Sequence, residues 1–289
     1  MKVSVIIPTL NSEQWISQQL DMLLSQSVEA EILVIDSDST DLTTAVVAAY
    51  GERVRLLQIP QSDFDHGGTR DYALRQSRGD CVLFLTQDAL PTNERYIENL
   101  LRPFADKRIA AAFGRQIARP DAPEYERLTR QFNYPDQPRV WEAKDIPRYG
   151  VKAYFFSDAC SAYRREAYFE VGGFDAPILT NEDMMMAAKL LHAGYALAYA
   201  PEASVYHSHR YSLRTEYRRN VKIGTVMEQY RDRLTGAHPD AEGWRLLHYV
   251  CGELVRHGQV GEVLVFSAHA AARLTGNLVG KLRGRRRRA

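Results

Sequence analysis

The first 115 residues alternate between short apolar runs and segments in which apolar residues return at helical spacing. The apolar runs predict strands at VSVIIP, EILVID, VRLLQIP, CVLFL and IAAAFGRQI. The segments between them predict helices over residues 13–25, 41–50, 69–77 and 93–105. Strands that alternate with helices in this way form a mostly parallel sheet with helices on both faces. We therefore expect an α/β fold.

The pattern changes twice further along the chain. Residues 119–153 are polar, aromatic and rich in proline, which predicts a long excursion over the active face. Two more strands are predicted at YFFSDACSAYRR and YALAYAP, and helices over residues 165–171 and 182–192. After Arg210 the pattern is helical: one face carries Leu247, Val250, Cys251 and Leu254, and another carries Ala271, Leu274, Leu278 and Leu282. We expect a domain over residues 1–209 and a helical extension over residues 210–289.

The overall composition is consistent with this fold, and the distribution of charge along the chain adds information about the C-terminal extension. The chain has 289 residues, is 45% hydrophobic and carries a net charge of +1. Residues 210–289 hold 16 Lys and Arg against 7 Asp and Glu, a net +9, so the rest of the chain is at −8. Such polarity suggests that the extension, which ends in four consecutive arginines (Arg285–Arg288), meets an anionic surface. The acidic body argues against nucleic acid as that surface.

Three cysteines without a CxxC pair (Cys81, Cys160 and Cys251) indicate neither a disulfide framework nor a structural zinc site. The chain enters a strand at once, so we expect no secretory leader, and no apolar stretch is long enough to span a bilayer. A cytoplasmic enzyme, peripheral on the inner face of the cell membrane through its basic end, fits these features. The same amphipathic helices could instead pack on the body or on a second copy in a homo-oligomer.

Polar side chains follow three of the predicted strands where each strand ends. Thr9 and Asn11 follow the first, Asp36 the second, and Gln87 and Asp88 the fourth. Ligands of open α/β sheets bind outside the carboxyl ends of the strands, so these residues outline a pocket for a nucleotide. The Asp88 carboxylate suits Mg²⁺ or Mn²⁺. The alternatives are turn chemistry at Asp36 and a helix cap at Asp88.

Three further segments carry candidate chemistry. In His66-Gly67-Gly68-Thr69-Arg70, the glycines allow close backbone approach, and Arg70 with free helical N–H groups could hold a phosphate. Glu182 and Asp183 begin a helix, and Asp183 is a candidate general base, with helix capping as the alternative. His207 and His209 follow the last strand, where alternation predicts that at most one of them points into the site.

Taken in order, these segments resemble the family 2 glycosyltransferases with the GT-A fold. The matching stretches are VSVIIPTLN, ILVIDSDSTD, HGGTRDYAL, GDCVLFLTQDAL, VGGFD, NEDMMMAAKLLHAGY and AYAPEASVYHSH, and they cover residues 3 to about 209. Within that family, FDHGGTR and FLTQDA resemble the bacterial rhamnosyltransferases that use dTDP-L-rhamnose to build O-antigen and capsule glycans. The resemblance implies an inverting transferase with a nucleotide-binding half (1–115) and an acceptor-binding half (116–209), acting on a glycan or a lipid-linked acceptor.

The resemblance also implies roles for individual residues. Thr9 and Asp36 would contact the nucleoside, with Asn11 and Gln87 beside them, and Arg70 would lie on the nucleotide side of the site. Asp88 would bind the diphosphate-bound metal, and His207 would supply a second ligand, with His209 as its substitute. Asp183 would be the catalytic base, and Glu182 would orient the acceptor or a loop.

The sequence departs from the family pattern at two places. Thr86 stands where most members have the first aspartate of Asp-x-Asp, and Ser37 and Asp38 replace the usual acid and glycine. These departures bear on metal binding and on the second nucleoside contact. The alternatives are a family 2 transferase that uses a UDP- or GDP-sugar and, in a different class, a sugar nucleotidyltransferase. The latter normally carries a glycine-rich basic loop after its first strand, and PTLNSEQW has none.

Overall fold

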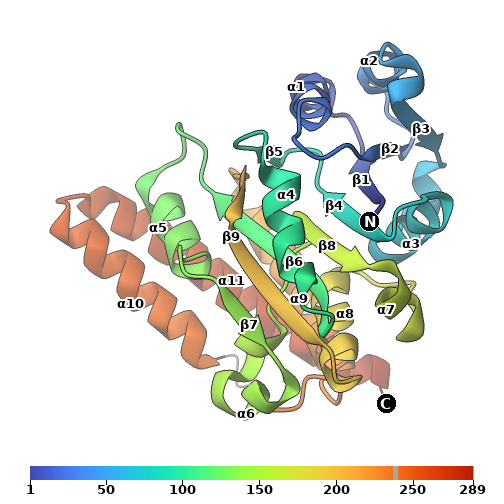
Figure 1. Ribbon diagram of the computed structural model, residues 1–289. Coiled ribbons are helices and arrows are strands. Elements are labelled where there is room, and N and C mark those ends of the chain that lie inside the picture. Colours follow the sequence, from blue (N-terminus) through green and yellow to red (C-terminus); the bar gives the residue numbers. More distant parts are fainter. Residues whose placement is uncertain (237–239, 289) are drawn as a thin grey trace.

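A computed structural model describes residues 1–236 and 240–288 of the protein, and its core is a single 9-stranded sheet (Figure 1). The strands are β1 (Val3–Thr9), β2 (Glu31–Asp36), β3 (Val54–Gln58), β4 (Cys81–Leu85), β5 (Leu90–Pro91), β6 (Ile109–Ile117), β7 (Arg139–Trp141), β8 (Cys160–Arg164) and β9 (Ala196–Tyr206). Their order is β3-β2-β1-β4-β8-β6-β9-β5, and β7 also pairs with β9.

The direction of each strand decides which strand ends meet at the same edge of the sheet. The strands β1 to β4, β6 and β9 run one way. The strand β8 is reversed and pairs antiparallel with both β4 and β6, while the short strands β5 and β7 run against β9. Alternation in the sequence correctly predicted the parallel first half, and β8 makes the complete sheet mixed. Because β8 is reversed, its first residue lies at the edge where β4 and β6 end.

Helices cover both faces of the sheet. On one face lie α1 (Glu13–Leu24), α2 (Thr43–Ala48) and α4 (Tyr96–Leu101), which pack Ile16, Leu20, Val47, Ile97 and Leu100 on the strands. On the other face lie α3 (His66–Gln76), α7 (Arg165–Glu170) and α8 (Glu182–His192). The α8 helix is almost wholly buried, and its own buried residues include three consecutive methionines from Met184 to Met186. The predicted α/β layering is confirmed.

The proline-rich segment 119–153 is more ordered than the sequence suggested. It contains α5 (Glu124–Asn133), the edge strand β7 and the short helix α6 (Ile146–Tyr149). The segment predicted as a long excursion therefore has regular structure over about half of its length. The prolines stand outside the α5 interior: Pro123 precedes its first residue and Pro135 follows its end.

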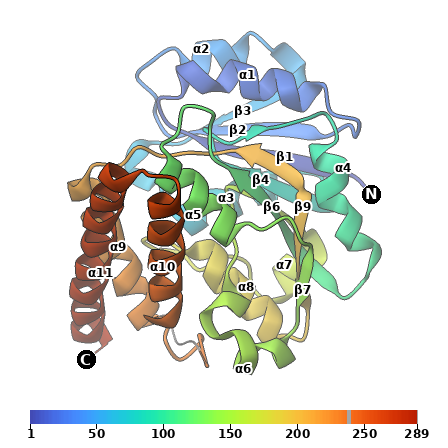
Figure 2. The ribbon, with the colours of Figure 1, turned by 90° about the vertical axis from the view of Figure 1, so that its left-hand side faces the viewer.

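Three helices follow the sheet: α9 (Leu213–Gln229), α10 (Asp240–Arg256) and α11 (Val260–Arg288). The helices α9 and α11 lie side by side (Figure 2). Glycines make this contact possible, since a Cβ atom on Gly224, Gly276 or Gly280 would lie within 2.5 Å of a carbonyl oxygen of the facing helix. The apolar face predicted on residues 247–254 is confirmed, because Val250 and Leu254 are fully buried against Phe266 of α11.

The second predicted apolar face lies on the opposite side of α11, and it is exposed. We call the exposed side that these residues share with Val260 and Leu264 the α11 outer face; its members are Val260, Leu264, Ala271, Leu274, Leu278 and Leu282. Leu264 is 72% exposed, Leu278 51% and Leu282 59%. Their spacing places them on one side of a helix over about 33 Å. In the described ranges, no helix is long and apolar enough to cross a membrane.

Candidate active site

The loops that follow β1, β2 and β4 meet at one edge of the sheet and are joined by hydrogen bonds. The side chain of Gln87 makes two hydrogen bonds to the backbone of Leu10: it accepts from the N–H (2.7 Å) and donates to the carbonyl oxygen (3.1 Å). The backbone N–H of Asn11 donates to Ser39 Oγ at 2.8 Å, and its side chain accepts from the N–H of Thr40. Asn11 and Gln87, two of the predicted nucleotide residues, therefore lie in loops that are held together at this edge.

Several of these side chains are already engaged in holding the loops. Asp36 is fully buried and accepts from both the N–H and the hydroxyl of Ser39, which is the turn arrangement considered as its alternative. The hydroxyl of Thr9 donates to the carbonyl oxygen of Ile7. Asn11 has a φ of 51°, a conformation that asparagine tolerates better than most residues. These contacts hold the loops that follow β1 and β2 in place at this edge of the sheet.

The second feature of this edge is a cluster of Asp88, His207 and His209. Asp88 Oδ1 lies 3.3 Å from His207 Nε2, and Asp88 Oδ2 lies 3.3 Å from His209 Nδ1. One ligand atom from each residue lies within 4.8 Å of the others, so the three could hold a metal ion together. The prediction that at most one histidine points into the site was wrong. The strand β9 ends at Tyr206, so the alternation of a strand no longer applies.

The three side chains of this cluster have lowered pKa values, which favour the protonation states that bind a cation. Burial lowers the pKa of His207, and burial together with the neighbouring His207 lowers the pKa of His209 to about 3. Burial alone would raise the pKa of Asp88, but the two histidines outweigh it and hold that pKa below its ordinary value. At neutral pH the cluster is thus one carboxylate beside two neutral imidazoles, which is the form that binds metals.

The third feature is a buried acidic cluster around the start of α8. Arg70 Nη1 lies 3.0 Å from Glu182 Oε1, and Arg70 Nε lies 3.9 Å from Asp158 Oδ2. Asp158 also accepts from the hydroxyls of Ser161 (2.6 Å) and Tyr163 (2.8 Å). The N–H of Asp158 donates to Asp183 Oδ2 at 3.2 Å. The single positive charge of Arg70 therefore lies among three carboxylates, those of Asp158, Glu182 and Asp183.

This imbalance has a direct effect on Asp183. Loss of water around its carboxylate, with the nearby charges of Glu182 and Asp158, raises the pKa of Asp183 well above its ordinary value. The residue still keeps part of its surface accessible. Burial likewise raises the pKa of Asp158 to about 6. Asp183 therefore combines access with a high affinity for protons, which is what a general base requires.

The turn before β8 makes hydrogen bonds toward both the Asp88–His207–His209 cluster and the acidic cluster. Ser157 accepts from the side chain of Gln116, which contacts His207, while the next residue, Asp158, contacts Asp183. The sequence predicted a strand over the whole of YFFSDACSAYRR, but β8 begins only at Cys160. This turn reaches the carboxyl edge because β8 is reversed.

The HGGTR segment behaves differently from its prediction. The helix α3 begins at His66, and Asp65 caps it by accepting from the N–H groups of Gly67 and Gly68. A Cβ on Gly67 would lie 2.2 Å from the carbonyl oxygen of Asp175, so this glycine serves a chain–chain contact. The expectation of free N–H groups for a phosphate was wrong here, and Arg70 faces the acidic cluster.

Two residues of the site were not selected from the sequence. Asp158 is 2% exposed, and a carboxylate between Phe156 and Cys160 was a signal that something must pair with it. Arg119 donates to the carbonyl oxygen of Asp88 at 2.6 Å and stacks on the indole of Trp15, with its guanidinium carbon 4.0 Å from the ring centroid. Arg119 thus brings a positive charge to the Asp88 loop.

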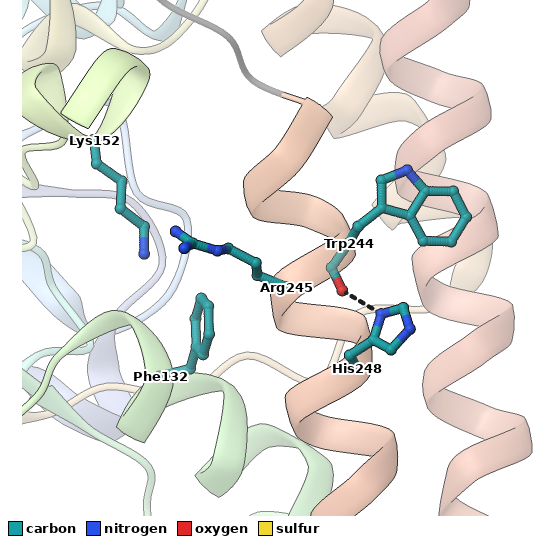
Figure 3. Close-up of a pocket in the computed structure, with 5 residues that line it drawn as sticks. All are labelled: Phe132, Lys152, Trp244, Arg245 and His248. Carbon is teal, nitrogen blue, oxygen red and sulfur yellow. Dashed lines mark hydrogen bonds between the residues drawn. The ribbon is translucent and has the colours of Figure 1, made fainter. Parts of the chain in front are cut away.

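An open pocket lies apart from these clusters, where α10 faces α5 and Lys152 (Figure 3). Its lining residues are Phe132, Lys152, Trp244, Arg245 and His248. Lys152 Nζ lies 4.7 Å from the centroid of the Phe132 ring. None of the residues selected from the sequence lines this pocket, so the site is defined by the clusters at the sheet edge.

Comparison with known proteins agrees with this geometry. Residues 4–172 match Glycosyl transferase family 2, and residues 138–273 match Glycosyl transferase family group 2. The chain is 39% identical over 226 residues to the O-antigen chain rhamnosyltransferase RfbN of Salmonella typhimurium, covering 78% of this chain and 72% of that protein. It is 38% identical over 224 residues to the O-antigen chain rhamnosyltransferase WbaN of Salmonella anatum, covering 76% and 70%.

Solved structures show the same fold. The chain is similar to the mannosyltransferase PcManGT from Pyrobaculum calidifontis in complex with GDP-Man and Mn²⁺, with a TM-score of 0.65 and 19% identity over 100% of this chain and 88% of that one. It is also similar to S. aureus TarS 1-349 in complex with UDP-GlcNAc, with a TM-score of 0.59 and 17% identity over 99% and 92%. The GT-A fold expected from the sequence is confirmed.

Proposed function

The chain belongs to glycosyl transferase family 2, and we propose that it transfers L-rhamnose from dTDP-L-rhamnose to a hydroxyl of a cell-surface glycan or its lipid-linked precursor. The match to two O-antigen chain rhamnosyltransferases over about three quarters of the chain supports the sugar and the acceptor class. The observation that carries the proposal is the pairing of two clusters through the turn at residues 157–158. One cluster suits a cation, and the other holds a base.

In the proposed reaction, an acceptor hydroxyl attacks the anomeric carbon of the donor from the side of Asp183. The new bond joins the acceptor oxygen to that carbon, and the bond from the carbon to the diphosphate oxygen breaks, with inversion. Asp183 takes the hydroxyl proton, and the diphosphate leaves with the electron pair. Glu182 and Arg70 hold the start of α8 in place through their ion pair, so we assign Arg70 to ordering the base.

The residues Asp88, His207 and His209 fit a divalent metal ion, and we propose Mg²⁺ or Mn²⁺. Two imidazoles beside one carboxylate favour Mn²⁺, because Mg²⁺ prefers oxygen ligands. When bound, such an ion would neutralise negative charge on the departing diphosphate. We propose that Arg119 adds a second positive charge there, and that Thr9, Asn11, Asp36 and Gln87 frame the nucleoside.

A transfer assay and a thermal-shift assay test this proposal together. We expect dTDP to raise the melting temperature more than UDP or GDP, and to do so more strongly with Mn²⁺. We expect dTDP-L-rhamnose, among a panel of nucleotide sugars, to give transfer to a lipid-linked acceptor. A larger shift with UDP or GDP and turnover of the matching sugar would replace the rhamnosyl donor. Pyrophosphate-dependent formation of a nucleotide sugar would make the protein a nucleotidyltransferase.

We also propose that the enzyme works at the inner face of the cell membrane and that the α11 outer face lies on the lipid. This face is apolar and free of charge, while the opposite side of the helix packs on α9. Arg283 and Arg286 are exposed just beyond its end, and each basic residue near an anionic bilayer contributes about 1 kcal/mol. Of the other arginines, Arg285 lies 3.4 Å from Glu228, and the side chains of Arg287 and Arg288 lie outside the described residues.

Vesicle co-sedimentation tests the membrane proposal. We expect the wild-type chain to bind vesicles that contain anionic phospholipid, and the Leu264→Glu/Leu278→Glu variant to lose most of that binding. Val140→Glu is the matched control, since Val140 is 48% exposed on the distant edge strand β7. If the double variant bound vesicles normally, the face would not be the lipid contact. If the variant changed only the sedimentation mass of the protein, the face would instead be an interface with a second copy.

A further inference from the structure

The His207 ring makes a hydrogen bond, on the side away from Asp88, to a residue that has no role in the function proposed above. Gln116, on β6, is only 2% exposed, and its Oε1 lies 2.7 Å from His207 Nδ1. The same Oε1 accepts a hydrogen bond from Arg130 Nη1. The other end of the amide donates from Nε2 to Ser157 Oγ at 2.8 Å.

These contacts fix the orientation of the amide and, through it, of the imidazole. An arginine side chain has only donors, so the Gln116 atom that it contacts must be the oxygen. An oxygen accepts, so His207 Nδ1 must carry the hydrogen that it shares with Gln116. In the neutral imidazole the lone pair is then on Nε2, which faces Asp88 Oδ1 at 3.3 Å. Two acceptors that face each other at this distance leave a place for a cation between them.

The support continues into α5, in the acceptor half. Glu126 and Arg130 are one helical turn apart and lie 3.8 Å apart at Oε1 and Nη2. Glu126 Oε1 also accepts from the backbone N–H of His209 at 3.2 Å. One turn of α5 therefore contacts the backbone of His209 directly and His207 through Gln116, and Figure 1 shows where α5 lies in the fold.

We propose that Gln116 is a positioning residue that presents the Nε2 lone pair of His207 to the metal ion, and that Glu126 and Arg130 of α5 hold this arrangement. The metal site is thereby set from the acceptor half of the protein. The inference rests on the metal ion of the proposed function and adds to it the residues that orient the ligands. Outer residues that orient a metal-ligating histidine typically change metal affinity about 10- to 100-fold.

The test is a Mn²⁺ titration of the full-length protein, in which the electron paramagnetic resonance signal reports free Mn²⁺. We expect Gln116→Met, which removes the acceptor, to weaken binding about 10- to 100-fold. Gln116→Glu keeps an acceptor toward both His207 and Arg130, so it should bind nearly as the wild type does. Arg130→Met leaves the amide free to turn over, so its loss should be smaller than that of Gln116→Met.

A second measurement reads the orientation directly and does not depend on metal or activity. Two-dimensional ¹⁵N spectra of the histidine side chains should show the Nδ1–H form for His207 in the wild type and in Gln116→Glu, and a mixture in Gln116→Met. Unchanged Mn²⁺ affinity in Gln116→Met, or equal losses in the Met and Glu variants, would overturn the inference. Wild-type protein that transfers sugar but binds no Mn²⁺ would overturn it as well, while leaving the transferase assignment intact.

Discussion

Asp88 and Asp183 are both carboxylates at the same edge of the sheet, yet their surroundings push them in opposite directions. Two histidines and no other carboxylate contact Asp88 among the described residues, and its pKa is lowered. Asp183 has the carboxylates of Glu182 and Asp158 as neighbours, and its pKa is raised. One site holds its negative charge at every ordinary pH, and the other binds protons readily.

The difference separates two tasks that a sugar transfer requires. A permanent carboxylate beside neutral imidazoles can hold a cation against a leaving diphosphate. A carboxylate crowded by like charges can take a proton from a hydroxyl. Titratable groups whose surroundings drive their pKa values apart are a general sign of assigned acid–base roles. The comparison predicts that substitutions at the two sites fail in different ways.

The largest effect is expected at Asp183. Asp183→Asn removes the base, so transfer should fall by up to about 10⁴-fold, because general base catalysis typically contributes 10²- to 10⁴-fold. Binding of dTDP and Mn²⁺ should stay as in the wild type, as measured by thermal shift and Mn²⁺ titration. Asp106→Asn is the matched control, because Asp106 is a half-buried carboxylate that pairs with Arg108. Normal turnover by Asp183→Asn would remove the assignment of the base.

The next effect concerns Asp88. Asp88→Asn should lower transfer by about 10²- to 10³-fold, the usual loss when one group that stabilises developing charge is removed. In contrast to Asp183→Asn, this variant should also lose Mn²⁺ binding and the extra thermal shift that Mn²⁺ gives with dTDP. If Asp88→Asn kept its Mn²⁺ affinity, the metal site would lie elsewhere and the contrast between the two carboxylates would collapse.

The smallest effect is a change in pH dependence. Wild-type activity should fall as the pH drops through the raised pKa of Asp183, since the base then becomes protonated. Asp158→Asn removes a neighbouring negative charge, so this loss should move to lower pH. The pKa of Asp158 is itself about 6, so its charge acts on Asp183 only above that pH. A profile of kcat/KM against pH measures the shift, and an unchanged profile would show that Asp158 does not act through its charge.

The sequence predicted most of the framework, because each element has a local signal. The strand at Ile109–Ile117 and the helix at Glu182–His192 have the predicted limits. The helix α5 was missed because prolines surround it, although Tyr125, Leu128 and Phe132 have helical spacing. Proline marks the ends of a helix as often as the absence of one. Alternation also misled at His207, because it assumes a strand that had already ended.

The candidate site was predicted only in part, because its partners come from distant segments. The sequence selected Asp88, Asp183 and both histidines by their positions at strand and helix ends. It could not show that Arg70 meets Glu182, 112 residues later, since that contact depends on how α3 and α8 pack on the sheet. Asp158 and Gln116 were missed for the same reason. Their function lies in contacts, and neither belongs to a recognisable motif.

The reversed strand β8 also bears on the order in which the molecule can be assembled. Cys81 of β4 pairs with Arg164 of β8, about 80 residues further along the chain. A growing chain therefore exposes the edge of β4 until β8 has been synthesised, and pairings this distant in sequence form slowly. Exposed edges are sites of aggregation. A fragment that ends before Cys160 would keep the loops that follow β1, β2 and β4, and its β4 edge would stay open to pairing with other chains.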